Sequence, residues 1–130
     1  MPEEDNNAYD ELFVDDVEPQ NIVLDSVKPF LRFTDKGDIV EQDDFYELNG
    51  KQQVLVLILG TKVLEAKDIR DQEGLRVAEL VELTGMGESS VEGYVYGTLS
   101  DVVESDDGRI FVPNYRVRDA ARELKVSKNE

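Results

Sequence analysis

Residues 76–99, RVAELVELTGMGESSVEGYVYGTL, decide the fold of this chain, because they predict two short helices joined by a tight turn. Leu80 lies on the apolar face of the first helix, and Gly85 follows that helix where a residue with positive φ commonly ends it. Val91 and Val95 are one helical turn apart and predict the buried face of the second helix. Small and apolar residues at these places allow the two helices to cross closely.

A hairpin and a final helix are predicted after this pair. Residues 101–113, DVVESDDGRIFVP, place Asp107 and Gly108 between two short apolar runs, and an Asp-Gly dipeptide favours a tight primed turn. Pro113 ends the second run. The final helix is predicted from apolar residues at the spacing i, i+3, i+4, i+7, namely Val117, Ala120, Ala121 and Leu124.

A longer helix is predicted before the pair, over residues 50–67. Its apolar positions between 54 and 64 fit one helical face, although the run 54–59, VLVLIL, is also typical of a buried strand. The continuation through Lys, Glu and Ala to Lys67 favours the helix. Gly60 costs such a helix about 1 kcal/mol relative to Ala, which predicts a close contact with another helix at that point.

The first part of the chain gives weaker signals. Residues 1–20 hold eight acids and no base, and this composition predicts a disordered acidic tail. In residues 21–48, Pro29 argues against one continuous helix. We expect a short helix or extended piece up to Lys28, followed by a hairpin in which Gly37 takes a positive φ.

The order of these elements, with Gly85 and Met86 in the turn, resembles the winged helix-turn-helix superfamily of archaeal and bacterial transcriptional regulators. The resemblance departs from the usual pattern at Val81, where Ala is commonest, and at Gly87, where Ser or Thr is commonest. It implies a mainly α fold with a small β-hairpin wing, preceded by an acidic N-terminal extension. The expected divisions are the tail 1–20, the extension 21–48, the winged helix-turn-helix domain 49–126 and a tail 127–130.

The net charge of −16, from 30 acidic and 14 basic residues, allows two interpretations. Residues 1–50 carry −12 and residues 51–130 carry −4. Such a surface resembles that of proteins from salt-accumulating halophilic archaea, where molar salt shortens the Debye length to about 3 Å. The alternative is a specific acidic tail that covers a basic DNA-binding face or mimics nucleic acid.

Composition excludes several classes of function. The chain has no cysteine and no histidine, so it lacks a disulfide, a thiol nucleophile, an imidazole base and the ordinary zinc or haem ligands. We therefore expect no enzyme activity, no catalytic residue, no metal site and no cofactor. The longest apolar run, 54–59, is far shorter than the ~20 residues that span a bilayer. The acidic N-terminus has no signal-peptide pattern, which predicts a cytoplasmic protein without a membrane partner.

The resemblance implies a DNA-binding transcriptional regulator whose second helix, residues 88–99, enters the major groove of double-stranded DNA. None of its outward residues supplies the bidentate contact of arginine to guanine. Few phosphates are neutralised by a monomer, so we expect a homodimer. The candidate DNA-binding residues are Glu88, Ser89, Ser90, Glu92, Gly93 and Tyr96 on this helix and Arg109, Arg116 and Arg118 on its flanks, with Lys51 and Arg76 as further candidates for phosphate contacts.

The alternative is a winged-helix protein–protein interaction module without DNA binding. Its partner would be a basic protein, bound through the acidic face or through the apolar residues 12–14 in the acidic N-terminal segment. The two hypotheses differ in one structural requirement. A DNA reader must hold Arg109, Arg116 and Arg118 on the same side of the molecule as Ser89 and Ser90.

Overall fold

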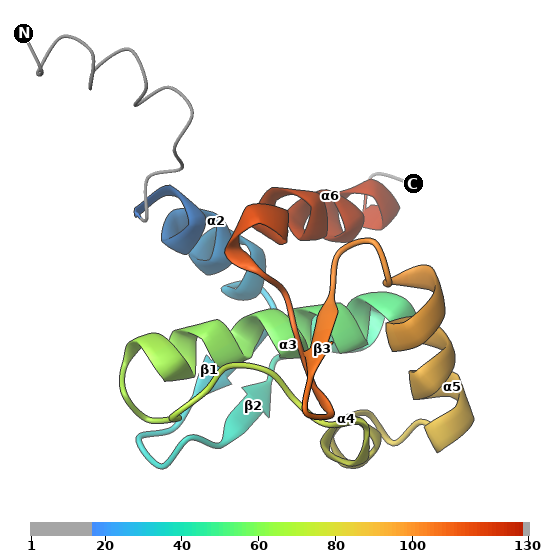
Figure 1. Ribbon diagram of the computed structural model, residues 1–130. Helices are drawn as coiled ribbons and strands as arrows, with labels where there is room; N and C mark the ends of the chain where they lie inside the picture. The colour runs from blue at the N-terminus through green and yellow to red at the C-terminus, as the bar shows by residue number, and fades with distance from the viewer. Residues whose placement is uncertain (1–16, 129–130) are drawn as a thin grey trace, which may run out of the picture.

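The computed structural model describes the backbone of residues 17–128 and the side chains of residues 19–124 (Figure 1). The described part is mainly helical and includes two antiparallel hairpins. Its α-helices are α2 (Val17–Val27), α3 (Gly50–Ala66), α4 (Val77–Thr84), α5 (Glu88–Gly93) and α6 (Val117–Lys128). The hairpins pair β1 (Leu31–Phe33) with β2 (Ile39–Glu41) and β3 (Glu104–Asp106) with β4 (Arg109–Phe111), and the short helices are η1 (Asp43–Glu47), η2 (Tyr94–Thr98) and η3 (Asn114–Arg116). None of the described helices is long and apolar enough to cross a membrane.

Helix α3 runs through the centre of the molecule, with α2 and α6 on one side of it and the β1–β2 hairpin and α4 on the other (Figure 1). Asn49 caps its start, because the Asn49 side chain accepts from the Gln52 amide at 2.9 Å and the Gln52 side chain accepts from the Asn49 amide at 3.2 Å. Residues 54–59 are all at most 1% exposed. The middle of the helix is therefore buried on every side, whereas the sequence predicted one apolar face.

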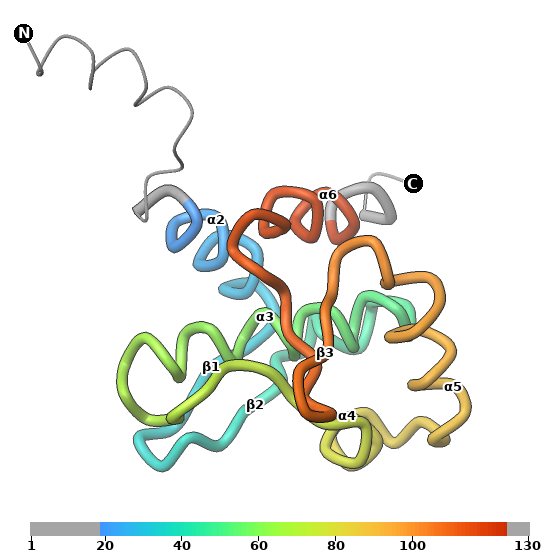
Figure 2. Tube along the Cα trace, in the orientation of Figure 1, coloured from blue at the N-terminus to red at the C-terminus, as the bar shows by residue number. Residues whose placement is uncertain are grey.

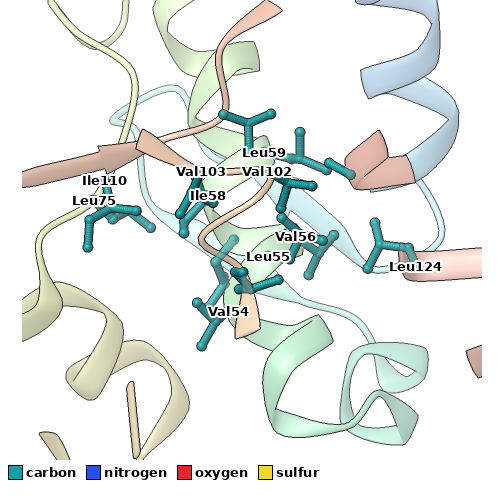
Figure 3. Packing of buried hydrophobic residues seen from close by; sticks show 14 of the residues in the cluster. Val54, Leu55, Val56, Ile58, Leu59, Leu75, Val102, Val103, Ile110 and Leu124 are labelled. Atoms are coloured by element: carbon teal, nitrogen blue, oxygen red, sulfur yellow. The ribbon is translucent and has the colours of Figure 1, made fainter. Parts of the chain in front are cut away.

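The core is built from segments on both sides of α3 in the sequence. Figure 3 shows side chains of α3 next to Val102, Val103 and Ile110 from the β3–β4 region and Leu124 from α6. Helix α6 buries all four residues that the sequence assigned to its apolar face. These contacts confirm the predicted final helix and its orientation toward the core.

Residues 21–48 belong to the same core, and the expected boundary at Asn49 does not separate two units. Val27, Phe30, Leu31 and Phe45 are each at most 6% exposed within the cluster around α3. Helix α2 begins at Val17, inside the range expected as a disordered tail, and residues 1–16 lie outside the described part. The predicted hairpin is present, with Gly37 at a φ of +93°.

Gly60 makes a close contact, but its neighbour is the β1–β2 hairpin. A Cβ atom on Gly60 would lie 3.0 Å from Leu31 Cδ1 and 3.2 Å from Phe33 Cζ. The predicted helix–helix contact at this position is therefore wrong. The spacing of apolar residues shows that a neighbour is close, and it does not show which element supplies that neighbour.

Helices α4 and α5 form the predicted pair around Gly85, which ends α4 at a φ of +75°. Met86 packs against the core, and Val91 and Val95 are 0% and 2% exposed. The second helix does not keep one geometry over 88–99: it changes to a π-helix at Tyr94, where the Leu99 amide donates to the Tyr94 carbonyl at 2.8 Å.

The β3–β4 hairpin has the tight turn that the Asp-Gly dipeptide predicts. Asp107 and Gly108 have φ values of +53° and +78°, as a primed two-residue turn requires. Leu75 connects this hairpin to the start of α4, because its amide donates to the Ile110 carbonyl at 2.9 Å and its carbonyl accepts from the Ile110 amide at 2.8 Å. The hairpin is thus fixed to the α3–α4 loop.

Candidate nucleic-acid interface

The outward side of the second helix is free of packing within the described chain. Val91 and Val95 point into the core, and residues 88–90, 92, 93 and 96–98 are exposed. Tyr96 has 57% of its surface exposed, whereas Tyr94 is half-buried against the core. The exposed residues include all six predicted for this helix: Glu88, Ser89, Ser90, Glu92, Gly93 and Tyr96.

Arg109 stands at the start of β4, beside the tight turn. Its Cγ atom lies 2.8 Å from the position of a Cβ on Gly74, so its stem packs on the α3–α4 loop. The guanidinium of Arg109 forms no hydrogen bond or ion pair with the residues that the structure describes. In a chain with 30 acidic residues, such a guanidinium is available to an external anion.

Arg76 lies opposite Arg109, because the antiparallel pair of Leu75 with Ile110 places these two arginines in register. Its Nη1 atom donates to the Asp107 carbonyl oxygen at 2.8 Å, and so holds the tight turn. Like charges directly opposite each other destabilise a pair of strands. The hydrogen bond to Asp107 accounts for Arg76, whereas the stability of the hairpin does not explain Arg109.

Arg116 and Arg118 lie elsewhere, at η3 and the start of α6. Asn114 of η3 accepts a hydrogen bond at 2.8 Å from Lys62, near the end of α3. The second helix lies near the other end, where a Cβ on Gly50 would be 2.7 Å from the Tyr94 hydroxyl. The twelve residues from 50 to 62 correspond to about 18 Å of helix.

Figure 1 shows a second separation, across α3: α6 lies along the upper edge of the molecule, and the tip of the β3–β4 hairpin, α4 and the start of α5 lie along the lower edge. Arg116 also pairs with Asp119 at 3.4 Å, and its guanidinium lies 5.4 Å from the centre of the Tyr115 ring. The requirement stated for a DNA reader is thus met in part. The hairpin tip with Arg109 lies on the same side of α3 as the start of α5 with Ser89 and Ser90, whereas Arg116 and Arg118 lie toward α6 on the other side.

Tyr115 ties the base of the β3–β4 hairpin to the start of α6. Its hydroxyl donates to the Glu104 carboxylate. This hydrogen bond raises the pKa of the Tyr115 hydroxyl above its usual value of 10.0. Because the negative Glu104 disfavours a second negative charge at this place, the contact is structural and does not make Tyr115 a base.

The charge around the candidate interface is strongly negative. Residues 76–111 contain eight acidic residues and two arginines, a net charge of −6. Two of the acids, Glu88 and Glu92, are on the outward side of α5. Among the described residues, no group of three or more acidic side chains is placed to hold a metal ion.

Thr61 supports this interface from inside the core, a role that sequence reasoning missed. Its hydroxyl is fully buried, donates to the Ile58 carbonyl at 2.6 Å and accepts from the Gly74 amide at 2.6 Å. Gly74 precedes the Leu75 bridge, so this hydrogen bond holds the loop from which the hairpin is fixed. Nothing local to Thr61 in the sequence indicates a partner thirteen residues away.

Replacing Thr61 with valine should lower the free energy of unfolding by about 1–3 kcal/mol, because the buried Gly74 amide loses its acceptor. Urea denaturation followed by circular dichroism measures the change. Thr98→Val is the matched control, since Thr98 is exposed and should change stability by less than about 0.5 kcal/mol. Equal losses in the two variants would contradict the role given to the Thr61 hydroxyl.

Comparison of the chain with protein-family models, curated proteins and solved structures finds no match.

Proposed function

We propose that this protein is a DNA-binding transcriptional regulator with a winged helix-turn-helix fold, acting as a homodimer in a high-salt cytoplasm. The observation that carries the proposal is the outward side of α5, which stands on the Gly85 turn with no covering element in the described chain. The tip of the β3–β4 hairpin with Arg109 lies on the same side of α3 as the start of α5. The order of α3, α4, α5 and hairpin agrees with the resemblance seen in the sequence.

The side chains on this side suit a limited set of DNA contacts. Ser89 and Ser90 hydroxyls bond phosphates or base edges, and a Glu carboxylate accepts from the cytosine amino group. Tyr96 adds a hydroxyl at the exposed end of the same face. Arg109 and Arg76 supply the positive charge for backbone phosphates. Arg116 and Arg118 are not part of the proposed contact.

Electrostatics explains why the proposal includes high salt. At about 0.1 M salt the Debye length is about 10 Å, so the eight acids of residues 76–111 repel the DNA backbone. At about 1 M it falls to about 3 Å, and only groups in direct contact still interact strongly. A basic regulator loses affinity as salt rises because it releases counterions. In this protein, higher salt also screens the repulsion between its acidic residues and the DNA backbone. The affinity gained in this way offsets the affinity lost at its few phosphate contacts.

Selective binding should be measured by fluorescence polarisation with a duplex from the region upstream of the protein's own gene and a scrambled duplex. We expect selective binding at about 2 M KCl that is no stronger at about 0.1 M KCl. Arg109→Ala should weaken it about tenfold, which corresponds to the loss of one charged phosphate contact. Sedimentation of the complex gives the number of protomers on the duplex.

Arg122→Ala is the matched control, because Arg122 is an exposed arginine paired with Asp119 at 3.1 Å on α6, which lies across α3 from the start of α5 (Figure 1). It removes the same charge and should leave the affinity unchanged. Equal weakening by both variants would show that only the total charge matters. Absence of selectivity at both salt concentrations would refute the DNA-binding proposal.

A second function, a winged-helix module that binds a basic protein, is favoured by the net charge of −6 over residues 76–111. The position of Arg116 and Arg118 away from α5 also agrees with it, because such a module has no need of arginines on that side. If the folded protein shows no selectivity between the two duplexes, the result would favour this second function over DNA binding.

A further inference from the structure

A cleft of about 520 Å³ lies between α2, the C-terminal half of α3 and η3, outside the candidate DNA interface. In Figure 2, α2 lies above that half of α3. Small-molecule sites in proteins have volumes of about 300–1,000 Å³. The walls of the cleft are apolar at Val23, Leu24, Val63 and Ala66. Leu24 keeps 54% of its surface exposed, which leaves an apolar side chain uncovered at the cleft.

The floor of the cleft carries a positive and a negative group side by side. The Lys62 side chain is nine-tenths buried, and its Nζ atom lies 2.8 Å from Asn114 Oδ1 and 2.8 Å from Glu73 Oε1. The contact with Glu73 is an ion pair, and the buried Oε1 atom of Glu73 has no further polar partner among the described residues. A carboxylate oxygen has two lone pairs, so Glu73 Oε1 can accept from a second donor.

Unused donors lie next to this acceptor. Lys62 has three N–H groups, of which one bonds Asn114 and one faces Glu73. The Asn114 side-chain amide forms no hydrogen bond as a donor within the described chain. The cleft therefore offers donors and a carboxylate acceptor close together, since Asn114 Oδ1 and Glu73 Oε1 each lie 2.8 Å from Lys62 Nζ.

The balance of charge selects the kind of ligand. Lys62 and Lys67 line the cleft together with Glu65 and Glu73, so the lining is neutral in a chain of net charge −16. A simple anion would meet Glu73, and a simple cation would meet Lys62. A ligand with both charges satisfies both groups.

We propose that this cleft binds a small zwitterion with an apolar side chain, of the α-amino acid class. Its ammonium group donates to Glu73 Oε1, its carboxylate accepts from Lys62 and the Asn114 amide, and its side chain covers Val23, Leu24 and Val63. The site is independent of the proposed DNA binding. The site lies next to the loop that fixes the β3–β4 hairpin, because Glu73 precedes Gly74, whose amide donates to the Thr61 hydroxyl.

Isothermal titration calorimetry of the full chain in about 2 M KCl tests the proposal, with L-leucine as the probe. Isocaproate, which lacks the ammonium, and isoamylamine, which lacks the carboxylate, are the matched ligands. We expect L-leucine to bind about tenfold more tightly than either, as the loss of one charge-assisted contact implies. This comparison uses the unmodified protein and does not depend on the folding of any variant.

Lys62→Met and Glu73→Gln should each weaken L-leucine binding about tenfold, with folding checked by circular dichroism. Lys51→Met is the control, because Lys51 forms an ion pair of the same length, 2.8 Å, with Glu123 near the other end of α3. Absence of detectable binding at about 10 mM L-leucine would overturn the proposal, because the dissociation constant would then lie far above that of ordinary small-molecule sites. So would equal binding of the three ligands, or binding seen only after removal of residues 1–16, which would show that the chain's own segment occupies the cleft.

Discussion

A chain shortened to residues 49–130 should fail to fold, although the winged helix-turn-helix resemblance covers 49–126. The missing segment supplies Val27, Phe30, Leu31 and Phe45 to the core around α3. Without it, part of the fully buried run 54–59 would face water. We expect no cooperative thermal transition in near-ultraviolet circular dichroism. A truncated chain that melts cooperatively near the Tm of the full chain would show that residues 17–48 are an appendage.

The point variant Phe45→Ala gives the same test in graded form. Phe45 is 1% exposed, and truncation of a buried phenylalanine costs about 3–5 kcal/mol in free energy of unfolding. Val40→Thr is its control in the same segment, because Val40 is 44% exposed and its replacement should cost less than about 0.5 kcal/mol. Denaturant unfolding measures both variants.

Gly74→Ala should lower the free energy of unfolding by about 3 kcal/mol or more, because two separate costs combine at this position. Gly74 has a φ of +100°, which strains any residue with a side chain. Its added Cβ would also lie 2.7 Å from the Ile110 carbonyl oxygen, a backbone atom that cannot move without breaking the Leu75 bridge. Hydrogen exchange at the Leu75 and Ile110 amides should increase along with the loss of stability.

Two other glycines separate these costs. Gly85 has a φ of +75° with open space around the added Cβ, so Gly85→Ala should cost about 1–2 kcal/mol from strain alone. Gly93 is helical with open space, so Gly93→Ala should be neutral or stabilise by up to about 1 kcal/mol. Equal losses at Gly74 and Gly85 would contradict the contact with Ile110.

The candidate site could be predicted from the sequence only where it depends on neighbours along the chain. The outward side of α5 followed from the spacing of Val91 and Val95, and the tight turn followed from Asp107 and Gly108. The division of the arginines could not be predicted. Arg109 and Arg116 are seven residues apart, yet the chain passes between them from the α4 side of α3 to the α6 side.

The amino-acid sequence is sufficient to predict the elements whose conformation is local: the end of α4 at Gly85, the turns at Gly37 and Gly108, and the apolar face of α6. Side-chain size, backbone φ and helical spacing act between residues a few positions apart, so they can be read directly. Three features depend on contacts between distant segments: residues 21–48 complete the core, the β1–β2 hairpin covers Gly60, and Thr61 supports the β3–β4 hairpin. An apolar face or buried hydroxyl requires a partner, but chain spacing does not specify which distant segment provides it.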